Sequence, residues 1–164
     1  MKKITTVFLV LGLCGTILAG CADSSAQGQE PSVAVYSISG ENKYFSISNG
    51  VLVLTPEKEI FYGGDLEPKQ LEDSGISEYS VTFYTLSGED ETILMSNSVA
   101  DETGGSLEIS GSTGKVTGDF LAKTDAEQLT DHLYCELKTT SLNGSQNEYQ
   151  LQLNATKITD SAAH

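Results

Sequence analysis

Three cysteines and two histidines are the most reactive side chains of this 164-residue chain, and their spacing limits the chemistry available to them. Cys135 lies three residues after His132 in HLYCELK, a stretch that alternates polar and apolar residues. An offset of three places two side chains on opposite faces of a β-strand, so the thiol and the imidazole cannot act as nucleophile and base. His164 is far away in sequence, and no two cysteines have the close spacing of zinc ligands. We therefore expect no Cys/His nucleophile and no zinc site.

Acidic residues form two local groups that a cation could use. Glu89-Asp90-Glu91 lies at an expected hairpin tip, and Asp101-Glu102 precedes Gly104-Gly105. Calcium favours oxygen ligands from such loops, but the spacing matches no EF-hand. Glycoside hydrolysis needs two carboxylates at a set separation in a cleft, and the chain has no Trp or Arg to line one. We assign no catalytic and no metal-binding residues and expect no cofactor.

Cys21 stands apart from the other cysteines because of what precedes it. The start Met1-Lys2-Lys3 is basic, the run 7–13 is apolar, and the residues before Cys21 are small, which together is the anatomy of an export signal. Leu18-Ala19-Gly20-Cys21 resembles the lipobox of bacterial lipoproteins. This resemblance implies cleavage before Cys21, attachment of a diacylglyceryl group to its sulfur, and acylation, typically with palmitate, of the new amino terminus.

The resemblance divides the chain into three parts. Residues 1–20 form the lipoprotein signal peptide, residues 21–32 a lipidated flexible tether, and residues 33–164 a β-sandwich domain. Two acyl chains anchor a protein stably to a membrane surface. The stretch ADSSAQGQEPS after Cys21 has no large apolar side chain and spans at most about 40 Å when extended. We expect a protein anchored to a bacterial membrane through Cys21 and facing outside the cytoplasm.

Charge excludes one class of partner. The full chain has a formal net charge of −14, and without Lys2 and Lys3 seven lysines face 23 acidic residues, a net charge of −16. Phosphate backbones repel such a surface, so we expect no nucleic-acid partner. Cys14 leaves with the signal peptide and Cys21 is expected to be acylated, which leaves Cys135 without a disulfide partner. Packing of the core must therefore stabilise the domain.

A first hairpin is predicted in YFSISNGVLVLT, residues 44–55. Asn49-Gly50 suits the positive φ angles of a two-residue turn, which would pair Ile47 with Leu52. One face would then carry Phe45, Ile47, Leu52 and Leu54, and the other Ser46, Ser48, Val51 and Val53.

A second hairpin is predicted near the end of the chain. A three-residue loop, Leu142-Asn143-Gly144, with Gly144 in the left-handed conformation, matches apolar with apolar positions. The pairs are Leu133 with Leu153, Cys135 with Leu151, Leu137 with Tyr149, and Lys138 with Glu148. Because a slip of one residue would move every side chain to the other face, this register is strongly specified and places Cys135 in the core.

Alternation predicts further strands and little helix. Residues 77–87 should form a strand with Tyr79, Val81 and Phe83 on one face, returning through a turn at 87–90. Shorter strands are expected at 33–39, 59–62 and 106–110, and short helices at 68–73 and from the capping box at 124–127. The fold class is all-β, an antiparallel β-sandwich with one or two short helices. An immunoglobulin-like topology fits the strand number, although its characteristic Cys and Trp are absent.

The segment 98–131 is the expected location of any binding site. It contains five glycines, shows little strand pattern, and exceeds the usual loop length. Two or three short edge strands joined by turns are the alternative interpretation of this segment.

We predict a lipid-anchored envelope module that binds or scaffolds an envelope protein or a small ligand. The alternative function is that of a small-ligand or cation (calcium) binding accessory protein, and the third is that of an envelope enzyme.

Overall fold

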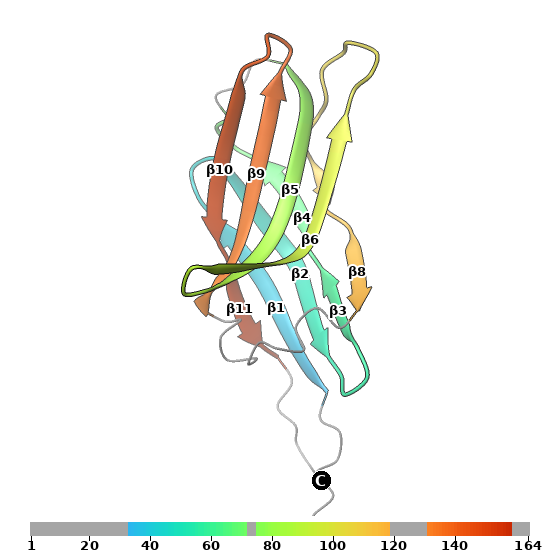
Figure 1. Ribbon diagram of the computed structural model, residues 1–164, viewed down its shortest axis with the longest axis vertical. Helices are drawn as coiled ribbons and strands as arrows, with labels where there is room; N and C mark the ends of the chain where they lie inside the picture. The colour runs from blue at the N-terminus through green and yellow to red at the C-terminus, as the bar shows by residue number, and fades with distance from the viewer. Residues whose placement is uncertain (1–32, 72–74, 119–130, 159–164) are drawn as a thin grey trace, which may run out of the picture. The chain divides into compact units, whose positions relative to one another are not determined.

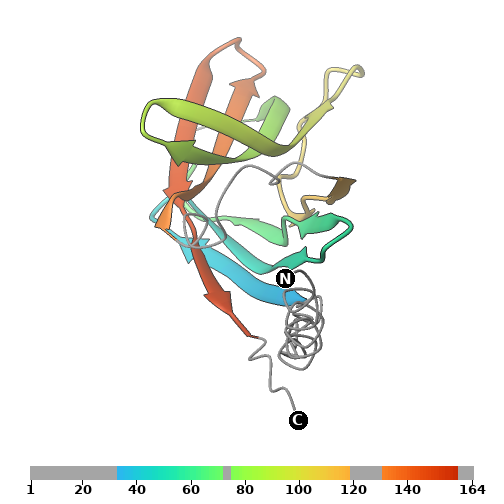
Figure 2. The same ribbon diagram turned by 60° about the horizontal axis from the view of Figure 1, so that its bottom comes forward.

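Two antiparallel β-sheets pack face to face in the computed structural model, which describes residues 33–71, 75–118 and 131–158 (Figures 1 and 2). The first, sheet A, has seven strands, and the second, sheet B, has four, in the order β10-β9-β5-β6. The strands of sheet A are β1 (Ala34–Glu41), β2 (Phe45–Leu54), β3 (Glu59–Tyr62), β4 (Asp65–Pro68), β7 (Gly111–Ser112), β8 (Lys115–Gly118) and β11 (Asn154–Lys157). Those of sheet B are β5 (Ile76–Ser87), β6 (Asp90–Ala100), β9 (Leu133–Ser141) and β10 (Gln146–Gln152). The all-β sandwich expected from the sequence is therefore what the chain forms.

Four short strands of sheet A behave as two long, interrupted ones. β2 pairs with β3 through Val51 and Tyr62, and with β4 through Ser48 and Asp65, in one continuous register. β7 and β8 pair with β4 and β3 in the same manner. Sheet A is thus five strands wide, in the order β11, β1, β2, β3 with β4, and β8 with β7. Gly63-Gly64 and Thr113-Gly114 are the interruptions.

The interruptions line up across sheet A in what we call the glycine seam, the residue pairs Asn49-Gly50, Gly63-Gly64 and Thr113-Gly114. Hydrogen bonds join the second and third pairs, because the Thr113 amide donates to the Gly64 carbonyl at 2.9 Å and the Gly63 amide to the Gly114 carbonyl at 3.2 Å. Asn49 has a φ of 58° and Gly64 a φ of 87°, which is the left-handed region. At each pair, the alternation of inward-facing and outward-facing side chains along the strand shifts by one residue.

The prediction of a hairpin turn at Asn49-Gly50 is therefore wrong, whereas the predicted division of the strand residues into a buried and an outer face is confirmed. β2 runs straight through this dipeptide, and the register of β1 against β2 shifts beside it, as at a β-bulge. One extra residue in a straight strand shifts the alternation of buried positions, so that Ile47 before it and Leu52 after it both face the core. A two-residue turn would have placed the same two residues on one face. The faces thus agree with the sequence pattern even though the chain does not reverse there.

The core lies between the two sheets. Phe61 of sheet A and Phe83 of sheet B are fully buried, with ring centroids 5.2 Å apart and planes at 63°. This edge-to-face arrangement is favourable for aromatic rings. Val81 and Phe83 face inward as predicted, with Tyr79 at the margin of the core. Burial of these large apolar side chains provides most of the stabilisation that a domain with no disulfide needs.

Sheet B contains both remaining predicted turns, and both are confirmed. Ser87 pairs with Asp90, and Gly88 at the first central position has a φ of 66°, the pattern of a type II′ turn. In β9 and β10, Leu137 pairs with Tyr149 and Cys135 with Leu151, while Gly144 has a φ of 83°. The three-residue loop and register predicted for this hairpin are the observed ones.

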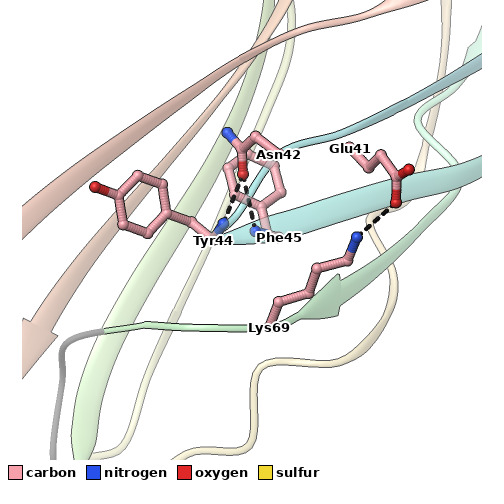
Figure 3. A network of polar contacts seen from close by, with 5 residues as sticks. All are labelled: Glu41, Asn42, Tyr44, Phe45 and Lys69. Atoms are coloured by element: carbon pink, nitrogen blue, oxygen red, sulfur yellow. Dashed lines mark hydrogen bonds and ion pairs between the residues drawn. The ribbon is translucent and has the colours of Figure 1, made fainter.

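Figure 3 shows the polar contacts of the β1–β2 turn, where Asn42 also joins the two sheets. The Asn42 side-chain oxygen accepts hydrogen bonds from the amides of Tyr44 at 2.8 Å and Phe45 at 3.0 Å. Its amide nitrogen donates to the Gln150 carbonyl of β10 at 2.9 Å, so one side chain shapes a turn of sheet A and binds sheet B. Beside it, Lys69 approaches Glu41 to 2.6 Å and lowers the pKa of that carboxyl through this hydrogen bond.

Two further sequence expectations fail in the described residues, and four short strands were not predicted. The helix at 68–73 is absent over 68–71, because Pro68 ends β4 and residues 69–71 are not helical. The strand at 106–110 is reduced to a single bridge between Leu107 and Ile76. Strands β4, β7, β8 and β11 were not predicted; each has four residues or fewer, and alternation is weak evidence over such lengths. The capping box at 124–127 lies outside the described residues.

The strand order also differs from the immunoglobulin arrangement. There the third strand belongs to the opposite sheet from the first two, whereas here β1, β2 and β3 are neighbours in sheet A. Within the residues that the structure describes, no helix is long and apolar enough to cross a membrane.

The glycine seam leads to a stability prediction. A Cβ atom at Gly63 would lie 2.3 Å from Thr113 Oγ1 and 2.7 Å from Phe83 Cε2, so Gly63→Ala should destabilise the domain by about 1–3 kcal/mol through overpacking. The exposed Ser98→Ala should stay within about 0.5 kcal/mol. Urea unfolding followed by circular dichroism measures both, and equal midpoints for the two variants would show that the seam tolerates a side chain.

Candidate functional site

The structure separates the two residues closest to a nucleophile pair. Cys135 is fully buried on the core face of β9, whereas His132 is exposed just before that strand. Burial raises the pKa of the Cys135 thiol well above its usual range, because the thiolate would lose its hydration. The predicted placement on opposite faces is confirmed, and the thiol acts as a small apolar side chain of the core.

The acidic residues of the loop after β6 bind their own backbone. The Asp101 carboxylate accepts hydrogen bonds from the Thr103 hydroxyl at 2.6 Å and from the Thr103 amide at 2.9 Å. These two bonds, the hydroxyl's foremost, lower the pKa of Asp101. The Asp101 amide donates to the Ser77 carbonyl at 2.8 Å, which ties the loop to β5. Asp101 thus shapes a turn.

The second acidic group, Glu89-Asp90-Glu91, is exposed around the β5–β6 turn. Throughout 33–71, 75–118 and 131–158, no three His, Cys, Asp or Glu side chains come together as a metal site would require.

The segment 98–131 is less irregular than expected over the part that is described. Residues 98–100 belong to β6, and 111–118 contain β7 and β8 at the edge of sheet A. Thr113 is buried, and its hydroxyl donates to the Gly64 carbonyl at 3.0 Å. This part is the alternative of short edge strands joined by turns; residues 119–130 lie outside the described residues.

A depression on the outer face of sheet B is the better candidate for a binding site. It has a volume of about 350 Å³ and lies over three adjacent strands, β5, β9 and β10. Its lining comes from segments 78–80, 138–140 and 146–148, and the side chains that alternate to the outer face are Glu78, Ser80, Lys138, Thr140, Gln146 and Glu148. All six are polar, so the surface can form many hydrogen bonds.

Lys138 is the centre of charge in this depression. Its ammonium lies 2.8 Å from Glu136 Oε1 and 3.5 Å from Glu148 Oε2. The hydrogen bond to Glu136 is the main reason that the pKa of Lys138 is raised. Two carboxylates thus pair with one ammonium, and Glu78 lines the same depression, which leaves the surface acidic overall.

An aromatic pair lies farther along the same face. The rings of Tyr84 and Tyr134 stack with centroids 5.6 Å apart, and the Gln150 side-chain amide donates to the Tyr84 hydroxyl from two strands away. Tyr84 is only 4% exposed although it belongs to the outer face, and burial raises its pKa. In Figure 1 the end of the β5–β6 hairpin crosses in front of β9 and β10. The outer face of sheet B therefore has polar side chains in the depression and a stacked tyrosine pair farther along the strands.

Sequence reasoning did not find this surface, although one signal was present. Residues 146–152 read QNEYQLQ, with a polar side chain at every outward position of β10. Such alternation is typical of any solvated strand, so it indicates a binding surface only when neighbouring strands add to it.

No protein-family model, curated protein or solved structure matches this chain. Cys21, the predicted site of lipid attachment, lies outside the described residues.

The buried thiol can be tested directly. Cys135 should react with Ellman's reagent only through unfolding, even at pH 9, since the native state keeps it protonated and inaccessible. We expect negligible labelling of Cys135 in the native protein, and urea should make this thiol reactive. Labelling of the native protein at the rate of a free cysteine would contradict the core assignment.

Proposed function

We propose that this chain is a bacterial lipoprotein, anchored through Cys21 outside the cytoplasm, whose β-sandwich binds a polar partner on the outer face of sheet B. The observation that carries the anchor is Leu18-Ala19-Gly20-Cys21 after a basic and apolar leader. A thiol is nucleophilic enough to form the thioether, and small residues before it allow a peptidase to reach the backbone.

The connection between anchor and domain supports this proposal. Residues 22–32 join Cys21 to Val33, directly before β1, so the tether enters the sandwich at one end of sheet A. In Figure 1 that end is the lower one, whereas the β9–β10 loop lies at the upper end of sheet B. The depression is next to this loop, because residues 138–140 and 146–148 line it. A tether of at most about 40 Å keeps the domain near the membrane and leaves that face available.

The chemistry of sheet B supports a polar ligand. Ser80, Thr140 and Gln146 offer hydroxyl and amide groups, and Lys138 with its paired carboxylates offers both charges. Such a surface suits sugars or peptides rich in hydrogen-bonding groups. Its excess of carboxylates disfavours polyanions.

Fatty-acid labelling tests the anchor. Cys21→Ser should abolish incorporation of radioactive palmitate and leave an unprocessed chain, because the acceptor sulfur is gone. Cys14→Ser serves as the matched control, since it removes a thiol from the leader and should leave labelling unchanged. Equal labelling of the Cys21→Ser variant and the wild type would refute the lipoprotein assignment.

A thermal-unfolding panel tests the binding face, with calcium, other cations, sugars and peptides added to the mature protein. A ligand at one hundred times its Kd should stabilise the fold by about 2.7 kcal/mol. Lys138→Met should remove that shift, whereas Lys69→Met, which breaks a comparable exposed ion pair on sheet A, should retain it. Both variants should lose less than about 1 kcal/mol without ligand. A shift that survives Lys138→Met would place the site elsewhere.

A further inference from the structure

One half of the outer face of sheet A has a composition unlike the rest of this acidic protein. Two rows of side chains cross its five strands on the side of the glycine seam where β2 pairs with β3. We call these two rows the apolar strip. The first row is Ile158, Val35, Val53, Ile60 and Thr117, and the second is Thr156, Ser37, Val51, Tyr62 and Lys115. Six of these ten residues are large and apolar or aromatic.

The apolar strip faces away from the core. In β1 and β2, Tyr36 and Leu52 are buried between the sheets, so Val35, Val51 and Val53 alternate to the outer face. Ile158 is 61% exposed at one end of the first row, and Thr117 is exposed at the other. A solvated outer face normally alternates to polar residues, so this concentration of apolar side chains needs a physical reason.

Charge separates the apolar strip from its surroundings. None of its ten residues is acidic, although the chain has 23 acidic residues, and its single charge is the cation Lys115. Across the glycine seam, the same face carries Glu41, Asp65 and Glu67. Tyr62 marks the boundary, since its hydroxyl donates to Asp65 Oδ1 at 3.2 Å. The strip is therefore a place where an acidic domain can approach an anionic surface without repulsion.

Position decides what this surface meets. Val33, 48% exposed, directly precedes β1, and Ile158 hydrogen-bonds to Val35 beside it, so the strip lies where the tether joins the sandwich. Figure 1 shows this end of sheet A, where β1 begins and β2 turns into β3. We infer that the apolar strip docks on the headgroup region of the membrane that holds the lipid on Cys21. The inference rests on the proposed function, because only the anchor brings a bilayer within reach of the strip.

Interfacial chemistry agrees with this assignment. Apolar side chains gain free energy when they enter the boundary between headgroups and acyl chains, and tyrosine favours that depth because its ring is apolar and its hydroxyl polar. Lys115 at the edge can contact the phosphate of an anionic lipid. Docking through sheet A turns the opposite sheet outward, so the depression around Lys138 would face away from the membrane. One contact would thus orient the candidate binding site.

The absence of tryptophan provides a direct test. A single reporter is introduced into the mature, lipidated protein as Ile158→Trp or Thr117→Trp, at the two exposed ends of the first row, and as Ser98→Trp on the outer face of sheet B for control. Each protein is reconstituted into vesicles of phosphatidylethanolamine and phosphatidylglycerol with or without brominated acyl chains. Both strip reporters should lose fluorescence about twofold, as expected for side chains roughly 5–10 Å into the boundary, and the Ser98→Trp reporter should not.

Flotation of the same vesicles separates the possible failures. Protein that floats with the vesicles while neither strip reporter is quenched would overturn docking and leave the anchor intact. Equal quenching of all three reporters would also overturn it, since no face would then be preferred. Protein that does not float would refute the anchor, and the docking with it. Unchanged circular dichroism of the three variants confirms that each reporter sits on the native fold.

Discussion

Close backbone approach along the glycine seam is the constraint on which the sandwich depends. A Cβ atom at Gly64 would lie 2.2 Å from the Ser48 carbonyl oxygen, so only glycine lets β4 approach β2 there. A Cβ atom at Gly63 would lie 2.7 Å from Phe83 of the opposite sheet, so the same seam also sets how closely the sheets pack. Both approaches lie beside the one-residue shift in β2 by which Ile47 and Leu52 face one core from a single strand.

The seam also organises the surface of sheet A. Because the inward and outward positions exchange there, Ser48 and Asp65 on one side give way to Val51 and Tyr62 on the other. The acidic half and the apolar strip are therefore parts of one sheet face, separated by a backbone irregularity. The same backbone irregularity thus brings Ile47 and Leu52 to one core and leaves one region of the outer face without acidic side chains.

The candidate site on sheet B shows where prediction from sequence stops. The register of β9 against β10 was predictable, because a short loop and alternating residues leave one consistent pairing around Cys135 and Leu151. The neighbour on the other side is β5, whose Ser80 lies opposite Lys138 from far away in the chain. No local pattern selects that neighbour, so the depression over three strands could not be read from the sequence.

Local rules determined the existence of the main strands, their inner faces, the turn at Gly144 and the burial of Cys135, because period-two alternation and glycine conformation act over a few residues. The leader and Cys21 stay a prediction that rests on the resemblance of Leu18-Ala19-Gly20-Cys21 to a lipobox. Only tertiary structure decided that Asn49-Gly50 is a bulge: a turn and a one-residue insertion both place Ile47 and Leu52 on one face, so the local sequence cannot distinguish them. The choice is made by the neighbouring strands, β1 on one side and β3 with β4 on the other, which pair with β2 before and after this dipeptide.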